Sequence, residues 1–512
     1  MEGAAGDGGL PQAIGGEPVL AGADFIRFRE LVLDRTGILF AERRLPALAR
    51  GLARVAREAR CSGLDELYSL LQRSKTDTEL WDELVSHVTI GETYFFRNAA
   101  HMHALRKHVL PELISRRRRE RRLRIWCAGC ATGEEPYSVA ILLRELLPVP
   151  SGAEGLAETS RWNILILATD INRDALAAAR EAVYQPWSLR DCDDRIRRRY
   201  FSERDGSFGL RPEVREMVSF AYLNLAEDAY PSLASNTNAM DLVICRNVFI
   251  YLSEQTSRKV SERLHRCMAP DGWLIVGAAE TGTSLFAPLA SHNVEGAIIY
   301  QKQAEAAERP AQPRPALPRQ ALLIETPAPP RRPPRPRAAP APSPPAEPDR
   351  SAEAARLARE GRYKEAIACF CAYVIDHPGS PTACCQLARL YANVGNLDTA
   401  EKWASRAIEL DPLLTEAHYT LGLIRQERGA LEGAAECFKR TLYLEPEFIV
   451  ARFSLAGAYQ ALGRARDAAR ERRQVVRLAA GKSPDEVLPG SDGTTVGRLL
   501  TMLEATEAMG TP

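Results

Sequence analysis

A 34-residue period in the C-terminal part of the sequence limits what the chain can fold into more than any other feature. Three series of residues recur at this spacing: Gly361, Gly395, Gly429 and Gly463; Pro378, Pro412 and Pro446; Leu387, Leu421 and Leu455. A glycine permits the turn after one helix and a proline ends the next, so each period predicts a helix hairpin. Small residues such as Ala388 and Ala400 let the paired helices approach closely. We therefore expect a stack of helix pairs.

The repeat pattern resembles the tetratricopeptide repeat. Three full units run from about residue 381 to 480, and a degenerate unit leads them from about 350, so residues 350–480 are assigned to the array. The resemblance implies a further protein partner that binds through the array. Four cysteines fall inside the expected helices, and we expect them to pack in the core rather than bind a metal: Cys369, Cys371, Cys384 and Cys385.

Shifts in composition mark the segments outside the folded parts. Residues 304–349 hold 15 of the 34 prolines, mixed with Arg and Ala, and predict an extended, semi-rigid linker. Residues 1–20 are rich in Gly, Ala and Pro and are expected to be disordered. The tail, residues 481–512, begins as a loop and predicts one amphipathic helix around 496–509.

Between about residues 123 and 302, apolar strands alternate with helices. LRIWC (123–127), NILILATD (163–170) and DLVIC (241–245) read as buried strands, and GWLIVGA and EGAIIYQ would complete a sheet. Strands separated by helices of ten to fifteen residues predict a mainly parallel, doubly wound sheet. Sheets of this kind bind ligands at the carboxyl ends of their strands.

Polar and small residues follow the first two of these strands. Gly129 and Gly133 allow a tight turn that passes close to a cofactor, and Asp170 is placed to accept hydrogen bonds from ribose hydroxyls. Glu134 and Glu135 begin the next helix, where a carboxylate repels the diphosphate of a nicotinamide cofactor. The pair suits the cationic amino group and sulfonium of S-adenosylmethionine, although one of the two is expected only to stabilise the helix end.

Four motifs resemble, in order and spacing, those of the CheR-type chemoreceptor methyltransferases. They are GETYFFR (91–97), WCAGCATGEEPY (126–137), ATDIN (168–172) and CRNVFIYL (245–252), and the resemblance covers roughly residues 22–302. It implies a Rossmann-like α/β methyltransferase domain at 91–303, with an all-α domain at 21–90 before it. It also implies methyl transfer from S-adenosylmethionine to glutamate side chains of methyl-accepting chemotaxis receptors.

The resemblance assigns roles to individual residues. Thr93 and Arg97 would line the methionine end of the cofactor, Glu134 or Glu135 would hold its amino group, and Asp170 its ribose. Asn224 and Leu225 would flank the adenine, while Arg246 and Asn247 would close the pocket. Arg97 and Tyr251 are the catalytic candidates. Gly91 stands where the family pattern has Asn, so a side-chain contact to the cofactor is missing or replaced by backbone.

The chemistry of the motifs agrees with this reading. A glutamate with a pKa near ~4.3 is already ionised at neutral pH and needs no general base, and the motifs contain no histidine. Base-methylating relatives of this broad class carry Pro-Pro after the strand occupied here by DLVIC, where this chain has Arg-Asn-Val. Two alternatives stay open: a methyltransferase for a small molecule or RNA, and a repeat scaffold with a non-catalytic cofactor-binding domain.

Basic residues gather outside the motifs. Arg43, Arg50, Arg54 and Arg57, with Arg44 alongside, lie at helical spacing in AERRLPALARGLARVAREAR and predict a face that docks acidic receptor helices; the alternative is a solvated charged face. The cluster around Arg117 and Arg122 precedes a strand and is expected to be a solvated helix end. A small β excursion is expected at about 200–222, an insert that in relatives can bind a receptor's C-terminal peptide by adding a strand.

Overall charge and hydropathy indicate where the chain works. The formal net charge of +1 gives no signal for nucleic acid, and no apolar run approaches the ~20 residues of a membrane helix. No basic and apolar leader opens the sequence. The single CxxC pair, Cys127 and Cys130, is expected to hold no metal or redox function. These features predict a cytoplasmic protein without membrane insertion or a nucleic-acid partner.

Overall fold

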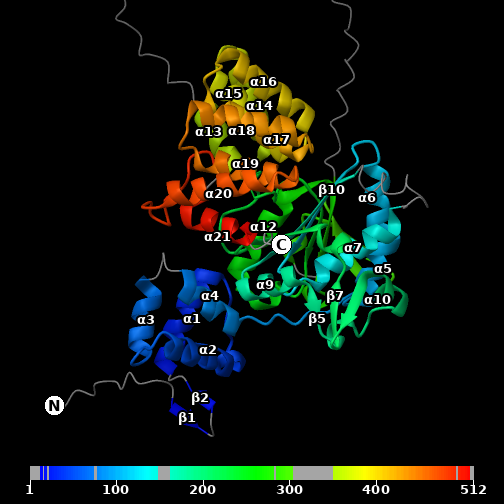
Figure 1. Ribbon diagram of the computed structural model, residues 1–512, viewed down its shortest axis with the longest axis vertical. Helices are drawn as coiled ribbons and strands as arrows, with labels where there is room; N and C mark the ends of the chain where they lie inside the picture. Colours follow the sequence, from blue (N-terminus) through cyan, green and yellow to red (C-terminus); the bar gives the residue numbers. More distant parts are fainter. Residues whose placement is uncertain are drawn as a thin grey trace, which may run out of the picture.

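The computed structural model describes residues 12–14, 17–19, 22–73, 78–147, 162–233, 235–281, 284–303, 350–491 and 494–507. These residues form an N-terminal helical domain, a central α/β domain and a C-terminal helical array (Figure 1). In this view the array stands above the α/β domain, and the N-terminal helices lie below and to one side. The expected linker, residues 304–349, lies outside the described residues.

Four helices and one 3-10 turn make the N-terminal domain: α1 (Gly22–Thr36), the turn Glu42–Arg44, α2 (Leu45–Glu58), α3 (Leu64–Arg73) and α4 (Thr78–Val88). Leu48, Leu52 and Val55 lie on one face of α2 and are buried against Phe28 and Phe40. The predicted all-α domain is therefore confirmed. The hairpin β1 (Gln12–Ile14) and β2 (Glu17–Val19) lies within the segment expected to be disordered, so that prediction was wrong there. Residues 1–11 lie outside the described residues.

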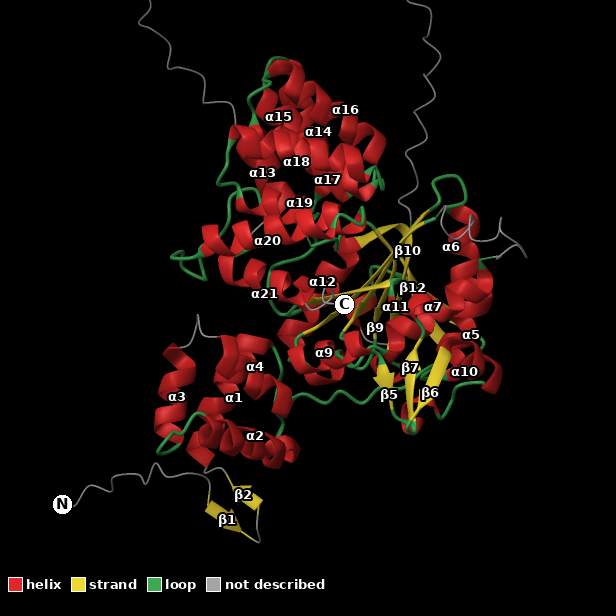
Figure 2. Cartoon of the chain, viewed as in Figure 1, coloured by secondary structure: helices red, strands yellow, loops and turns green. Residues whose placement is uncertain are grey.

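The α/β domain is built on a seven-stranded sheet of order β11-β12-β10-β9-β3-β4-β8 (Figure 2). Its strands are β3 (Arg122–Ala128), β4 (Asn163–Asp170), β8 (Val218–Tyr222), β9 (Met240–Cys245), β10 (Met268–Val276), β11 (Ala290–Val294) and β12 (Ala297–Gln301). β10, β9, β3, β4 and β8 lie side by side in this order, and all neighbours among them are parallel. β12 pairs antiparallel with β10, and β11 pairs antiparallel with β12. The doubly wound, mainly parallel sheet predicted from the sequence is confirmed.

Helices cover both faces of this sheet: α5 (Ala99–Ala104), α6 (Leu110–Arg116) after a π-helical turn (Leu105–Val109), α7 (Glu134–Leu146), α9 (Arg173–Glu181) and α12 (Glu254–Cys267). The 3-10 turn Phe249–Tyr251 lies between β9 and α12, and the turns Ala278–Glu280 and Ser284–Phe286 lie between β10 and β11. Successive residues of β3 point to opposite faces: Ile125 and Cys127 pack in the core with α7, whereas Trp126 packs with α12. Both faces of the sheet are thus buried.

The β excursion differs from its expected bounds. It is a three-stranded antiparallel sheet of order β5-β7-β6, formed by β5 (Val183–Tyr184), the turn Pro186–Leu189, α10 (Asp194–Tyr200), β6 (Phe201–Arg204) and β7 (Ser207–Leu210). After α11 (Pro212–Arg215), the residues Val218–Tyr222 form β8, the edge strand of the main sheet, rather than part of the excursion. Val218 and Phe220 alternate into the core, and this burial draws the strand onto β4.

The C-terminal array contains eight stacked helices: α13 (Arg350–Arg359), α14 (Tyr363–Asp376), α15 (Pro381–Asn393), α16 (Leu397–Leu410), α17 (Thr415–Glu427), α18 (Leu431–Leu444), α19 (Ile449–Ala461) and α20 (Ala465–Ala479). The four periodic glycines follow the first helix of each pair and have φ between +74° and +80°. The first helices α15, α17 and α19 also contact one another and line one side of the stack. The predicted tail helix is confirmed as α21 (Val496–Glu507), which packs against α20 and β8.

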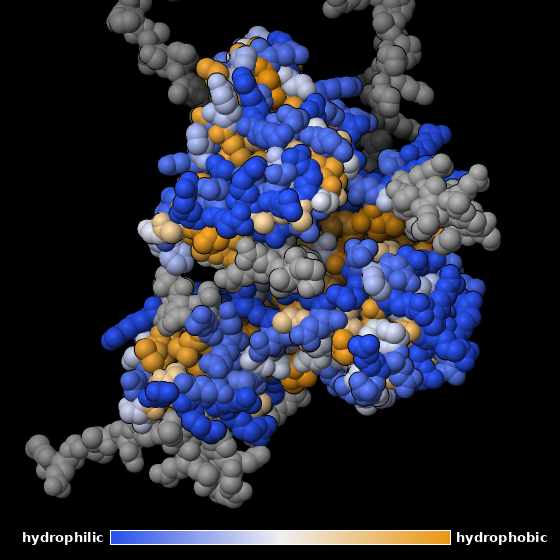
Figure 3. All heavy atoms as spheres, viewed as in Figure 1, coloured by the Kyte–Doolittle hydropathy of each residue, from blue (hydrophilic) through white to orange (hydrophobic). Residues whose placement is uncertain are grey.

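The turns of the array rest on the α/β domain. A Cβ atom added to Gly361, Gly395 or Gly429 would meet Arg266, Ala239 or Asn163, respectively, at 3.3 Å or less. Leu233, from the loop before β9, packs in the hydrophobic core of the array. Figure 3 shows a mostly hydrophilic face, with apolar side chains gathered in the recess between the array and the α/β domain. At these three turns the glycine that permits the turn therefore also permits close docking, whereas Gly463 has open space around it.

A buried carboxylate, Glu427 at the end of α17, joins the two parts. Its side chain accepts a hydrogen bond from Asn238 Nδ2 at 2.8 Å and forms salt bridges with Arg122 at 3.3 Å and Arg124 at 3.6 Å. Its backbone carbonyl accepts from Asn163 Nδ2 at 3.0 Å. Arg122 was expected at a solvated helix end; instead it begins β3 and is largely buried in this interface.

None of the helices in the described part of the chain has the length and apolar character of a membrane span.

We expect Glu427→Ala to weaken the docking of the array. The change leaves Arg122 and Arg124 buried without their shared partner, a loss of about 3 kcal/mol in unfolding free energy. Urea unfolding would measure it, and limited proteolysis would report release of the array. Glu436→Ala, at an exposed glutamate paired only with Lys439, is the matched control. Equal stability of the two variants would contradict the prediction.

Candidate functional site

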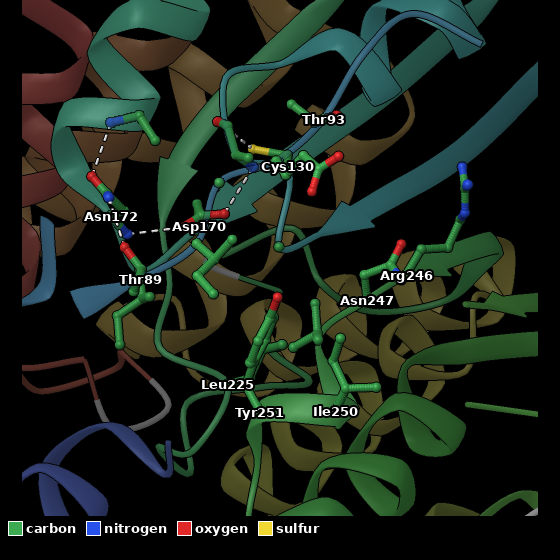
Figure 4. A pocket seen from close by; sticks show the side chains of 18 of the residues that line it. Thr89, Thr93, Cys130, Asp170, Asn172, Leu225, Arg246, Asn247, Ile250 and Tyr251 are labelled. Carbon is green, nitrogen blue, oxygen red and sulfur yellow. Dashed lines mark hydrogen bonds between the residues drawn. The ribbon is translucent and has the colours of Figure 1, made fainter. Parts of the chain in front are cut away.

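One cavity opens at the carboxyl ends of β3, β4 and β9, with the N-terminal helical domain as its outer wall (Figure 4). Eleven predicted site residues line it: Gly91, Thr93, Arg97, Gly129, Glu135, Asp170, Asn224, Leu225, Arg246, Asn247 and Tyr251. Glu134 does not. Asp170 and Asn172 lie across the cavity from Asn247, Ile250 and Tyr251. The fold thus brings Gly91 and Tyr251, which are 160 positions apart in the chain, into the wall of one cavity.

The turn after β3 can be built only with glycine at two positions. Gly129 has φ +77°, and a Cβ there would lie 2.4 Å from Val248 Cγ2; Gly133 has φ +92°, and its Cβ would lie 2.9 Å from that of Ala179. Cys127 and Cys130 flank this turn and are buried, and burial raises the pKa of both thiols well above the usual value. These thiols are therefore neutral packing groups in the structure.

Asp170 is fixed at the end of β4 by backbone donors. Ala131 N–H and Asn172 N–H each donate to one of its carboxylate oxygens at 2.8 Å. Burial raises the pKa of Asp170, and the backbone hydrogen bonds oppose this effect. The Asn172 side chain in turn donates to Thr89 Oγ1 at 2.9 Å. Because each carboxylate oxygen has a second lone pair, Asp170 can still accept hydrogen bonds from a ligand.

The two glutamates at the start of α7 have different environments. Glu134 is buried and accepts hydrogen bonds from Thr132 Oγ1 at 2.7 Å and Ser188 Oγ at 3.1 Å. Glu135 lines the cavity and accepts from Arg246 Nη1 at 3.2 Å. Burial raises the pKa of Glu135, and the nearby guanidinium groups of Arg246 and Arg97 oppose it. Glu135 is the one placed to meet a cationic ligand group.

The segment after β9 closes the other side of the cavity. Arg246 donates through Nη2 to the Arg97 carbonyl at 2.8 Å and so links two of the motifs. The guanidinium of Arg44, from the N-terminal domain, lies 5.0 Å from the Tyr251 ring centroid and donates to the Val88 carbonyl at 3.1 Å. Arg44 thus belongs to the cavity wall, although its sequence position suggested only a place beside the docking face.

Glu280 is a residue that the sequence analysis missed and that holds one wall of the cavity in place. Its buried carboxylate accepts from the backbone N–H groups of Gly277 at 2.6 Å, Asn247 at 2.9 Å and Ile250 at 3.2 Å. These bonds hold the segment that carries Asn247, whose φ of +59° is unusual for a non-glycine residue. The available signal was its position, a carboxylate four residues after the end of a buried parallel strand. The same rule applied to β10 would have found it.

The predicted docking face is only partly described. Arg50, Arg54 and Arg57 are exposed on α2, and Arg54 forms a salt bridge with Glu58 at 3.0 Å. The side chain of Arg43 lies outside what the structure describes. An exposed basic face is consistent with docking and with solvation alike, so the role of these residues stays a prediction.

Family models match most of the folded chain. The model described as "CheR methyltransferase, SAM binding domain" matches residues 91–288, and "CheR methyltransferase, all-alpha domain" matches residues 23–89. A "Tetratricopeptide repeat" model matches residues 381–412. The fold and the cavity thus coincide with a methyltransferase domain, its helical N-terminal partner and a repeat array.

Curated relatives give the same result. "Chemotaxis protein methyltransferase 1" of Pseudomonas aeruginosa is 31% identical over 52% of this chain and 92% of its own length. The "Chemotaxis protein methyltransferase" of Salmonella typhimurium is 30% identical over 56% of this chain and 93% of its own. "Probable biofilm formation methyltransferase WspC" of Pseudomonas putida is 28% identical over 87% of this chain and 98% of its own. The chain belongs to the CheR family of chemotaxis methyltransferases.

Replacing Glu280 by Ala should disorder the cavity wall after β9. Three backbone N–H groups, one of them buried and two half-buried, would lose their acceptor, at a cost of about 2–4 kcal/mol in unfolding free energy. Urea unfolding measures this loss, with Glu262→Ala, an exposed glutamate on α12, as control. A variant as stable as the control would show that Glu280 does not hold this segment.

Proposed function

We propose that this chain transfers a methyl group from S-adenosylmethionine to glutamate side chains of methyl-accepting chemotaxis receptors. The observation that carries the proposal is one cavity in a CheR-family domain that combines the carboxylates Glu135 and Asp170 with the guanidinium groups of Arg97 and Arg246. The relatives' names support the receptor system, and the four motifs support the cofactor.

The cavity residues fit S-adenosylmethionine group by group. Glu135 would hold the cationic amino group, and Asp170 would accept hydrogen bonds from the ribose hydroxyls. Asn224 and Leu225, directly after β8, would flank the adenine. Thr93 would line the methionine end, with backbone alone offered at Gly91. Tyr251 would place an aromatic ring near the sulfonium.

The bound cofactor supplies an electrophilic methyl group, and the acceptor carboxylate needs only to be ionised, dry and correctly oriented. Arg97 can orient that carboxylate: it lines the cavity, and its guanidinium is already turned by a hydrogen bond to the Glu92 carbonyl. Burial lowers the pKa of the nearby His101 to about 4, so it is neutral at pH 7. Methyl transfer to a carboxylate moves no proton, and the site requires no acid or base.

Receptor binding is assigned to the basic face of α2, and a second protein partner to the array. Arg50, Arg54 and Arg57 offer exposed positive charge to acidic receptor helices. The Pseudomonas putida relative matches across both the methyltransferase domain and the array, and its name refers to biofilm formation. A signalling system with that output is therefore a second candidate setting. We place the protein in the cytoplasm, where receptor signalling domains are accessible.

Transfer of radiolabelled methyl to purified chemoreceptor signalling domains tests the proposal. The full-length protein should give base-labile label on receptor, and Arg97→Ala should lower kcat at least about 100-fold, because the acceptor loses its orienting cation. Arg359→Ala, an exposed arginine of the array, should behave like the natural sequence. Absence of receptor label despite cofactor binding would favour another substrate or a scaffold.

Cofactor affinity should fall at acidic pH because of Glu135. Its pKa is raised, so as pH falls through that value the carboxylate takes up a proton and loses its attraction for the cationic amino group. Glu135→Gln should weaken binding at least about tenfold at pH 7.5 and reduce the loss of affinity on the acid side of neutrality. Calorimetric titration measures both, with Glu134→Gln, outside the cavity, as the contrast. An unchanged pH profile in Glu135→Gln would contradict this role.

A further inference from the structure

A stack of alternating cations and aromatic rings leads from the cavity to the surface. Tyr94 lines the cavity, and the guanidinium carbon of Arg97 lies 5.8 Å from its ring centroid. The guanidinium carbon of Arg190 lies 3.3 Å from the centroid of Tyr94 and 3.5 Å from that of Trp187. We call Tyr94, Trp187 and Arg190 the rim stack. It extends the catalytic pocket outward by two side chains.

The rim stack is held firmly against the cavity. Trp187 belongs to the turn Pro186–Leu189, whose Ser188 carbonyl accepts from the Phe95 N–H at 2.9 Å. The Ser188 hydroxyl donates to the buried Glu134 at the start of α7. Arg190 Nη1 donates to the Trp187 carbonyl at 2.9 Å, which fixes the guanidinium between the two rings. The turn is thus attached to two of the motifs that form the cavity.

The edge of the cavity is apolar and exposed at several points. Trp187 is 53% exposed, and the cavity-lining residues Ile90 and Ile250 are 54% and 48% exposed. Apolar groups gathered at the mouth of a site mark a surface that another protein covers. Trp, Tyr and Arg are also the residues enriched where protein contacts carry most of their binding energy. A small cofactor that fills the cavity would leave this edge uncovered.

The positive charge of Arg190 is available to a partner. Among the described residues, no carboxylate forms a salt bridge with it, whereas Arg197 and Arg199 on α10 and Arg54 on α2 are each paired to an acid. The two rings are inclined at 75° to each other, so the guanidinium contacts both of them and keeps part of its N–H edge as donor. Arg97 and Arg190 both lie within 6 Å of the Tyr94 ring.

We propose that the rim stack recognises the substrate helix itself, an acidic helix whose acceptor glutamate is followed, about one turn away, by a second carboxylate. The acceptor enters the cavity at Arg97, the second carboxylate meets Arg190, and Trp187 covers the apolar side chain between them. Carboxylates three or four positions apart on a helix lie on one face of that helix. Two such carboxylates could therefore meet Arg97 and Arg190, which both lie beside the Tyr94 ring. This inference rests on the proposed function and adds a determinant of which glutamates are methylated.

Steady-state methyl transfer with Arg190→Gln tests the inference on a receptor domain that the natural sequence methylates. We expect KM for the receptor to rise about tenfold, with kcat and cofactor affinity within about twofold of the unchanged protein. Trp187→Ala should raise the same KM. The salt dependence of KM should shrink in Arg190→Gln, since one charge pair is lost. Arg198→Gln, an exposed arginine on α10, is the matched control.

The outcomes are distinguishable. Receptor labelling with an unchanged KM and unchanged salt dependence in Arg190→Gln would overturn the rim stack and leave the glutamate methyltransferase intact. A loss of cofactor affinity in Arg190→Gln would also overturn it, because that loss would show a purely structural role for Arg190. Arg190→Lys keeps the charge, so its KM for the receptor should lie between those of Arg190→Gln and the natural sequence. Failure of the natural sequence to label any receptor would overturn both proposals together.

Discussion

Parallel pairing of β3 with β4 on one side and β9 on the other is the constraint on which the rest of the molecule depends. Ala128 pairs with Thr169, and Cys127 pairs with both Ala168 and Ile244, so the three strands end at one level. The residues at these strand ends therefore lie together at the cavity: the glycine turn after β3, Asp170 at the end of β4 and Arg246 after β9. The side chains of the cavity come from four separate motifs, and the ladder of backbone hydrogen bonds sets the relative positions of the three that follow a strand.

Buried carboxylates fix the loops and side chains that follow the strands, and each carboxylate is stabilised by a different set of donors. Asp170 and Glu280 accept backbone N–H groups and shape loops, whereas Glu135 faces guanidinium groups across the cavity. A buried carboxylate without such donors would be protonated or would destabilise the fold. The cavity thus holds both carboxylate and guanidinium groups in fixed positions, which suits the proposed reaction between an ionised carboxylate and a cationic cofactor.

Features that repeat or alternate along the chain could be predicted from the sequence. The helix pairs follow from the period of Gly361 and its successors, and the strands from runs such as 123–127, because local rules fix them. Of the residues that line the cavity, Gly129, Glu135 and Asp170 were predicted from their places at strand ends, and eight others only from the resemblance of the motifs to a known family. The different roles of Glu134 and Glu135 could not be predicted from the sequence, because they depend on the hydrogen bond that Ser188, in the β excursion, donates to Glu134. Glu427 and Arg122 meet across 305 positions, and no local pattern announces such a pair.

The anchoring of the array at both ends has a consequence for how this chain can evolve. Stacked repeats commonly gain or lose whole units, because each contacts only its neighbours. Here the turn at Gly361 lies on Arg266, Glu427 in the middle is buried among Arg122, Arg124 and Asn238, and α21 at the far end reaches β8. One additional unit would carry α21 past its strand or pull Glu427 from its partners. The number of repeats is thereby fixed by the width of a sheet that is not part of the array.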